Sequence, residues 1–250
     1  MPLVVLLAVI NIVLIVHAAK TGRFSPWGYI ILMLPGVGAL AYVLVELVPE
    51  WFRSPQAQQA RRGLTRTLDP ERRYRALSED LSVTDTIANR AALAEECLHL
   101  GKYDEAITQY DAILAQPLGD DPIYLLGRAR AEYGLGRPDK AVATLDELRS
   151  RWPDYQSAEG HLLYARALED SGRPQQAAEE YQTLAHYYPG AEARVRYGVL
   201  LQKLGRDLEA RTLLADTLVQ MRRSPRHVRS AQAEWIAMAE QAMRAAPAPK

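Results

Sequence analysis

Cysteine is almost absent from this 250-residue chain, in which Cys97 is the single example. A lone cysteine excludes a disulfide framework and any metal site built from paired cysteines. Cys97 lies in a segment with helical periodicity, where a free thiol usually behaves as a small apolar residue. We therefore expect Cys97 to be part of the core and not a nucleophile.

Catalytic motifs are missing as well. The sequence has no glycine-rich phosphate loop and no His-Glu-x-x-His segment, and its five histidines are scattered over separate stretches. Acidic pairs such as Glu95-Glu96 are typical of solvated helix faces. These absences predict a protein that is not an enzyme and that binds neither a cofactor nor a metal ion.

The chain has no net charge, because 30 basic residues balance 30 acidic ones, but the charges are segregated. Residues 53–75 contain seven arginines and two acidic residues, whereas residues 76–221 contain 15 basic and 24 acidic side chains. The acidic body would repel nucleic acid, so we expect no nucleic-acid partner.

Two long apolar runs fill residues 1–50, at about 2–19 and 27–48. Each is close to the roughly 20 residues that a helix needs to cross about 30 Å of hydrocarbon. The short link between them predicts an antiparallel transmembrane hairpin. A cleaved signal peptide is the alternative for the first run, although no basic segment precedes it.

The basic stretch after the second run predicts the orientation of this hairpin. Basic side chains near a span tend to stay in the cytoplasm, so we expect both termini at the cytoplasmic face of a bacterial inner membrane. A basic collar of Arg53, Arg61, Arg62 and Arg66 is also a candidate site for anionic lipid, at about 1 kcal/mol per basic residue. The alternative is that the collar only sets the topology.

The second apolar run begins with aromatic residues and contains the segment Leu34-Pro35-Gly36-Val37-Gly38. Over residues 3–50 it resembles the two-span N-terminal module of bacterial cardiolipin synthases of the phospholipase D type. None of the five histidines has lysine two positions later, so the catalytic His-x-Lys of that family is not matched. The resemblance implies a membrane module and does not imply lipid synthesis.

A repeated segment follows beyond residue 80 of the chain. Gly101, Gly136, Gly172 and Gly205 each precede an alanine by five positions and stand 35, 36 and 33 residues apart. A turn glycine suits the end of a first helix, and the alanine lets the second helix pack closely. Pro138 falls near the start of a second helix, where its missing N–H costs little.

This spacing resembles the tetratricopeptide repeat, a helix–turn–helix unit of about 34 residues. The resemblance implies an all-α chain in which residues 82–221 form an α-solenoid of about four repeats. Residues 51–81 are a basic juxtamembrane linker, and 222–250 provide a capping helix and a short tail. A cap is expected because terminal repeats need a polar outer face.

In such an array, the first helices of the repeats line a concave groove that binds peptides. The candidate groove residues are Glu95, Arg130, Tyr133, Arg166 and Glu169. Arg130 and Arg166 occupy the same place in adjacent units, where two guanidinium groups could bind a carboxylate. The alternative is that each pairs with a nearby acid, such as Glu132 or Glu169.

These observations predict a membrane-anchored scaffold or adaptor that binds a protein or peptide partner in the groove. The alternative is a non-catalytic regulator of phospholipid or envelope synthesis that acts through its hairpin. The oligomeric state, the client and the pathway are not indicated by the sequence.

Overall fold

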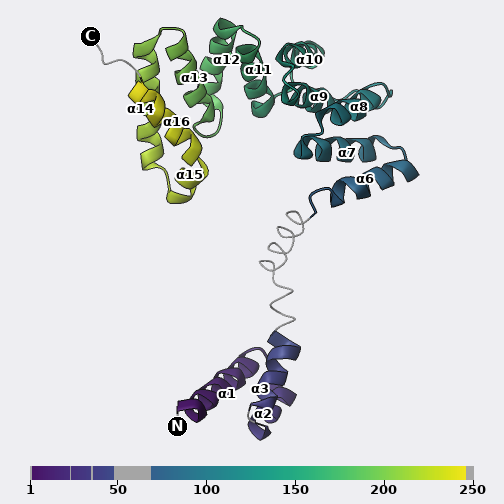
Figure 1. The fold of residues 1–250 in the computed structure, drawn as a ribbon, viewed down its shortest axis with the longest axis vertical. Coiled ribbons are helices and arrows are strands. Elements are labelled where there is room, and N and C mark those ends of the chain that lie inside the picture. The colour runs from purple at the N-terminus through teal and green to yellow at the C-terminus, as the bar shows by residue number, and fades with distance from the viewer. Residues whose placement is uncertain (1, 23, 35, 48–68, 246–250) are drawn as a thin grey trace. The chain divides into compact units, whose positions relative to one another are not determined.

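A computed structural model describes residues 2–22, 24–34, 36–47 and 69–245 of the chain. The chain divides into two compact units, residues 1–72 and 73–250, and each is described by itself. The described residues form helices and contain no strand (Figure 1).

The N-terminal unit is a helical hairpin. Its helix α1 (Pro2–Lys20) packs against α2 (Phe24–Met33) and α3 (Val37–Tyr42), and a π-helical segment η1 (Val43–Leu47) follows. Its core contains Ala18, Ile31 and Tyr42, each with no exposed surface.

The second apolar run, predicted as a span over 27–48, forms two helices, α2 and α3. The break falls between α2 and α3, where Gly36 has a φ of +94° that other residues rarely adopt. Gly38 is required for a different reason, the close approach of another backbone segment, because a Cβ there would lie 2.5 Å from the carbonyl oxygen of Ile30.

Within the described residues, no helix has both the length and the apolar character needed to cross a membrane. The structure therefore does not support the two predicted spans. The arginines of the predicted basic collar lie outside the described residues, as does Pro35.

The second unit is a row of antiparallel helix pairs (Figure 1). Each pair corresponds to one predicted repeat, so the register read from the turn glycines is confirmed. The helices are α7 (Ile87–Leu100) and α8 (Tyr103–Leu114); α9 (Pro122–Gly134) and α10 (Pro138–Arg151); α11 (Ala158–Asp170) and α12 (Pro174–Tyr187); α13 (Glu192–Lys203) and α14 (Asp207–Arg223).

Local signals explain where these helices begin and end. All four turn glycines have positive φ, from 70° to 76°. The first three units begin with capping side chains, because Thr86, Asp121 and Ser157 each accept a hydrogen bond from a backbone N–H of the first turn. The four alanines that follow the turn glycines are completely buried, as their packing role requires: Ala106, Ala141, Ala177 and Ala210.

Cys97 lies in this core with no exposed surface. Burial is the main cause that raises the pKa of its thiol to about 12. The prediction that Cys97 is part of the core is therefore confirmed.

Both ends of the array are covered by further helices. Before the first repeat, α6 (Arg72–Val83) packs Tyr74, Leu77 and Leu81 against the core formed by α7 and α8. The Tyr74 hydroxyl donates to Glu105 at 2.6 Å. Most of this helix, up to Leu81, lies in the segment 51–81 that was expected to be a linker.

After the last repeat, the structure has two helices where one capping helix was expected. They are α15 (Arg226–Ala231) and α16 (Ala233–Ala245), and α16 packs against α13 and α14. Gln232, between them, accepts a hydrogen bond from the backbone N–H of Ala191 at 2.9 Å. Since Ala191 itself offers no capping side chain, Gln232 caps α13 from a distant part of the sequence.

Ion pairs also connect successive units at their turns. Arg137 contacts Asp104 at 3.4 Å, and Arg173 contacts Asp139 at 3.1 Å, so the arginine after each turn glycine reaches the preceding unit. At the next turn, Gln175 replaces the aspartate, and Arg206 pairs with Glu209 of its own helix instead.

Candidate binding sites on the repeat array

The predicted groove residues lie on the first helices of the units, a surface that we call the first-helix face. Glu95 accepts a hydrogen bond from the hydroxyl of Tyr110 at 2.9 Å. Burial raises the pKa of Tyr110, and Glu95 raises it further. Glu95 is therefore held by its own repeat.

Arg130 differs from the other residues of this face. Its side chain is exposed, and it makes no hydrogen bond or ion pair with the residues that the structure describes. Glu132, the acid expected to pair with it, is buried and bonds instead to Thr144 at 2.6 Å and to Arg128 at 3.2 Å. The guanidinium group of Arg130 therefore keeps its donors available.

Arg166 and Tyr133 form a contact between adjacent units. The guanidinium carbon of Arg166 lies 4.9 Å from the centroid of the Tyr133 ring, which is within the range of a cation–π interaction. Tyr133 also donates a hydrogen bond to Asp170 at 2.5 Å. The buried Nε of Arg166 has no hydrogen-bond partner among the described residues.

Glu169, the last predicted groove residue, is not the partner of Arg166. It pairs with Lys203 of the next unit at 2.7 Å and accepts a hydrogen bond from Tyr181 at 3.3 Å. The structure thus brings Tyr133 and Arg166 together and ties Glu95 and Glu169 to other partners, while Arg130 stays unpaired among the described residues.

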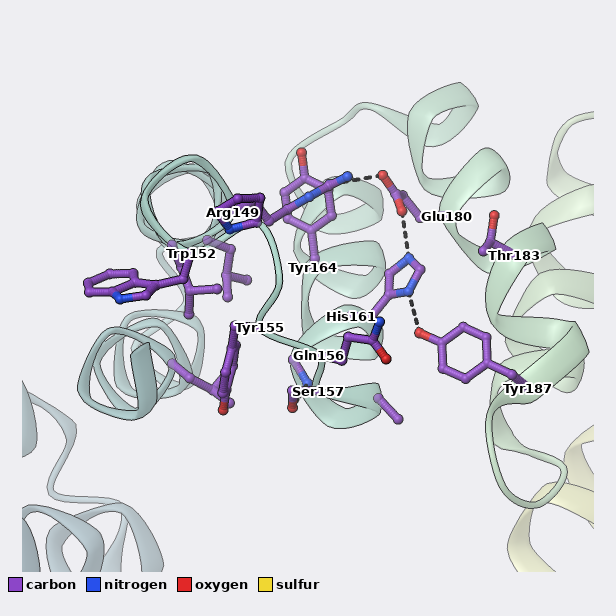
Figure 2. A pocket seen from close by; sticks show the side chains of 16 residues that line it. Arg149, Trp152, Tyr155, Gln156, Ser157, His161, Tyr164, Glu180, Thr183 and Tyr187 are labelled. Carbon is purple, nitrogen blue, oxygen red and sulfur yellow. Dashed lines mark hydrogen bonds and ion pairs between the residues drawn. The ribbon is translucent and has the colours of Figure 1, made fainter. Parts of the chain in front are cut away.

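A pocket of about 800 Å³ is lined by residues of α10, α11 and α12, by the segment 152–157 and by Leu126 of α9. Its floor contains Leu126, Leu145 and Leu148. Figure 2 shows Trp152 and Arg149 on one side, Thr183 and Tyr187 on the other, and His161 and Glu180 between them.

A chain of hydrogen bonds joins four of the side chains that line this pocket (Figure 2). The carboxylate of Glu180 contacts Nη1 of Arg149 at 3.1 Å and Nε2 of His161 at 2.5 Å. Nδ1 of His161 lies 2.5 Å from the hydroxyl of Tyr187. The hydrogen bond from His161, and then that from Arg149, lowers the pKa of Glu180 against the opposing effect of burial.

Sequence reasoning missed this pocket, because no local signal marks it. His161 lies eleven residues before its turn glycine, and the same register position holds Arg90, Leu125 and Arg194 in the other units, so a polar side chain there is not unusual. His161 had been regarded only as one of several scattered histidines. Among the described residues, no group of histidine, cysteine and acidic side chains could hold a metal ion.

The paired helices, turn glycines and buried alanines define a tetratricopeptide-type α-solenoid. Two family models described as tetratricopeptide repeats match residues 92–156 and 132–195, so the chain contains these repeats. No curated protein matches the chain.

A solved structure shows the same fold. This chain is similar to a thermophilic tetratricopeptide-repeat protein from Thermus thermophilus, with a TM-score of 0.50 and 17% sequence identity. The match covers 68% of this chain and 89% of the Thermus chain. Because that identity is low, the likeness concerns the fold alone. These comparisons give no support to the resemblance to cardiolipin synthases.

Proposed function

We propose that this protein is a non-catalytic scaffold that binds an acidic segment of a partner protein on its first-helix face. Tetratricopeptide repeats generally serve protein interaction, which supports the class of function. The observation that carries the proposal is the guanidinium group of the exposed Arg130, which has no hydrogen-bond or ion-pair partner among the residues that the structure describes.

The neighbouring groups make Arg130 a selective contact for carboxylates. A guanidinium group presents a planar set of donors that matches a carboxylate with two parallel hydrogen bonds. Arg166 is held beside Tyr133 and would add positive charge without a further loss of side-chain freedom. The acidic side chains of the face are already bonded, as shown by Glu95 and Glu169.

Binding of capped synthetic peptides tests this proposal. A peptide with four consecutive aspartate and glutamate residues should bind the full chain, and its asparagine and glutamine counterpart should bind more weakly. Arg130→Ala should weaken binding of the acidic peptide about tenfold, because hydrogen bonds to charged groups contribute roughly 1.5–3 kcal/mol. Arg137→Ala, which removes an exposed arginine at a turn, is the matched control. Equal binding by parent and Arg130→Ala would contradict the proposal.

We also propose that the N-terminal unit attaches the array to the cytoplasmic face of a bacterial inner membrane. Several large apolar side chains of this unit are exposed, including Leu32 at 71%, Met33 at 83% and Val37 at 69%. A patch of this kind is expected to contact an apolar phase. The basic collar would add attraction to anionic lipid.

Flotation with vesicles of anionic lipid tests this attachment. The full chain should float, and the paired substitution Met33→Glu and Val37→Glu should leave it at the bottom of the gradient. Leu208→Glu, at a residue of the array that is 77% exposed, is the matched control and should float like the parent. Replacing the hairpin by an unrelated anchor separates a scaffold, which should keep its function, from a regulator that acts through the hairpin itself.

A further inference from the structure

The pocket lined by α10, α11 and α12 has the size and walls of a binding site. Its volume of about 800 Å³ lies within the roughly 300–1,000 Å³ that is usual for ligand pockets. The aromatic rings of Trp152, Tyr155 and Tyr164 stand beside its leucine floor. Tryptophan and tyrosine are the residues that contribute most to binding energy at protein interfaces.

The walls are held in place before any ligand binds. Arg149 lies over the ring of Tyr164 at 4.8 Å, and the Tyr164 hydroxyl donates to Asp146 at 2.7 Å. Ser157 caps the first turn of α11 by accepting a hydrogen bond from Gly160 at 3.0 Å. A site that is already ordered loses less entropy when it binds.

The charged groups of the lining favour an uncharged occupant. One oxygen of Glu180 is bonded to Arg149 and the other to His161, so this carboxylate is already satisfied. A charged ligand would have to give up its hydration without finding a free counter-charge, and that loss is costly.

The remaining polar groups suit a peptide backbone. The carboxamide of Gln156 and the hydroxyl of Tyr155 line the pocket, and neither forms a hydrogen bond with the described residues. A carboxamide offers both a donor and an acceptor, which match the C=O and N–H of an extended chain.

We propose that this pocket binds an uncharged segment of a partner protein that inserts a large apolar side chain onto the leucine floor. The aromatic walls contact that side chain, and Gln156 bonds to the backbone beside it. None of the five predicted groove residues lines this pocket, so two segments of one partner, or of two partners, can be held at once.

Capped pentapeptides of the form Ala-Ala-X-Ala-Ala provide the probe, with X as phenylalanine, leucine, alanine, aspartate or lysine. Binding to the full chain is measured by titration of NMR signals. Peptides with phenylalanine or leucine should bind at least tenfold more tightly than those with alanine, aspartate or lysine. Equal binding of all five, or a preference for a charged X, would overturn the proposal.

A blocking variant locates the site. Thr183→Trp places an indole at an exposed position of the wall and should reduce binding of the phenylalanine peptide at least tenfold. His186→Trp adds the same group on the same helix at a position that does not line the pocket, and should bind like the parent. Loss in neither variant or equal loss in both would place the peptide elsewhere and refute the assignment.

Two further measurements distinguish the occupant and the face. If free N-acetylphenylalanine amide binds as tightly as the pentapeptide, the pocket takes a small molecule and the peptide proposal fails. Arg130→Ala should leave pentapeptide binding unchanged, so failure of the first-helix site and failure of this one are separate outcomes.

Discussion

The ring of Tyr110 on α8 lies directly against Gly127 on α9, so that a Cβ on Gly127 would come within 2.3 Å of Cζ of the ring. Tyr110 is only 1% exposed and cannot move aside into solvent. The absence of a side chain at Gly127 therefore allows the first and second units to pack at this distance.

Gly127→Ala should destabilise the array by about 1–3 kcal/mol, the usual cost of overpacking a core. Unfolding by urea, followed by circular dichroism, measures the change. Gly160→Ala is the matched control, because its Cβ would meet Leu126 at 3.2 Å and Ser157 at 3.3 Å, contacts that need shifts of only a few tenths of an ångström. Since alanine also favours a helix over glycine by up to about 1 kcal/mol, that variant should lose less stability than Gly127→Ala. Equal stability of the two variants would contradict the packing argument.

The two groove arginines should differ in their effect on stability. Arg166→Ala removes the contact with the Tyr133 ring and should lower the free energy of unfolding by about 1 kcal/mol. Arg130→Ala removes an exposed, unpaired side chain and should change it by no more than about 0.5 kcal/mol. Urea unfolding of both variants checks this difference, and a larger loss from Arg130→Ala would show that it has a structural partner.

The stability of the array should depend on the ionisation of Glu180. The pKa of Glu180 is lowered in the folded state. The stability that its carboxylate contributes is therefore present above the pKa that Glu180 has in the unfolded chain, and is lost as pH falls through its pKa in the folded protein. Glu180→Gln should therefore be less stable than the parent at pH 7, and the difference should shrink below about pH 4. Glu179→Gln, at the exposed neighbouring position, is the control and should follow the parent across the pH range.

Cys97 should resist thiol reagents in the folded protein. Burial raises its pKa to about 12, so the thiolate that reacts is scarce at neutral pH. Labelling with a chromogenic disulfide at pH 8 should proceed only as fast as the array unfolds, and should become rapid in urea. Fast labelling without denaturant would mean that the core opens locally at α7.

Replacing Gln175 should extend the row of ion pairs between units. Gln175 and Arg206 line one small pocket, so Gln175→Asp places a carboxylate where Asp104 and Asp139 stand in the earlier units. The expected gain is at most about 1 kcal/mol, since exposed pairs contribute little. Gln175→Asn keeps the size without the charge and is the control. The difference between them, measured by urea unfolding, should disappear in high salt.

The repeats could be predicted because their signals are local. A positive φ favours glycine at Gly101, and a β-region cap favours threonine at Thr86, whatever the rest of the chain does. The spacing of such signals along the sequence was enough to define each helix pair.

The partners of the polar side chains could not be predicted in this way. Arg166 contacts Tyr133 of the preceding unit instead of Glu169 on its own helix, because the choice depends on how adjacent units pack. The pocket beside His161 is likewise produced by the relation between α10, α11 and α12, which no local pattern records. In the N-terminal unit, the apolar composition indicated the length of the second run. The backbone adopts a positive φ at Gly36, which divides that run into two helices.

The bond between Gln232 and Ala191 has a consequence for the order of folding. A chain made from its N-terminus presents α13 before it presents the residue that caps it, 41 positions later. Until Gln232 arrives, the first turn of α13 has an unsatisfied N–H and should fray. The last repeat is thus completed only after Gln232 has been made, so a ribosome that stalls before Gln232 would leave a nascent array with its final unit open.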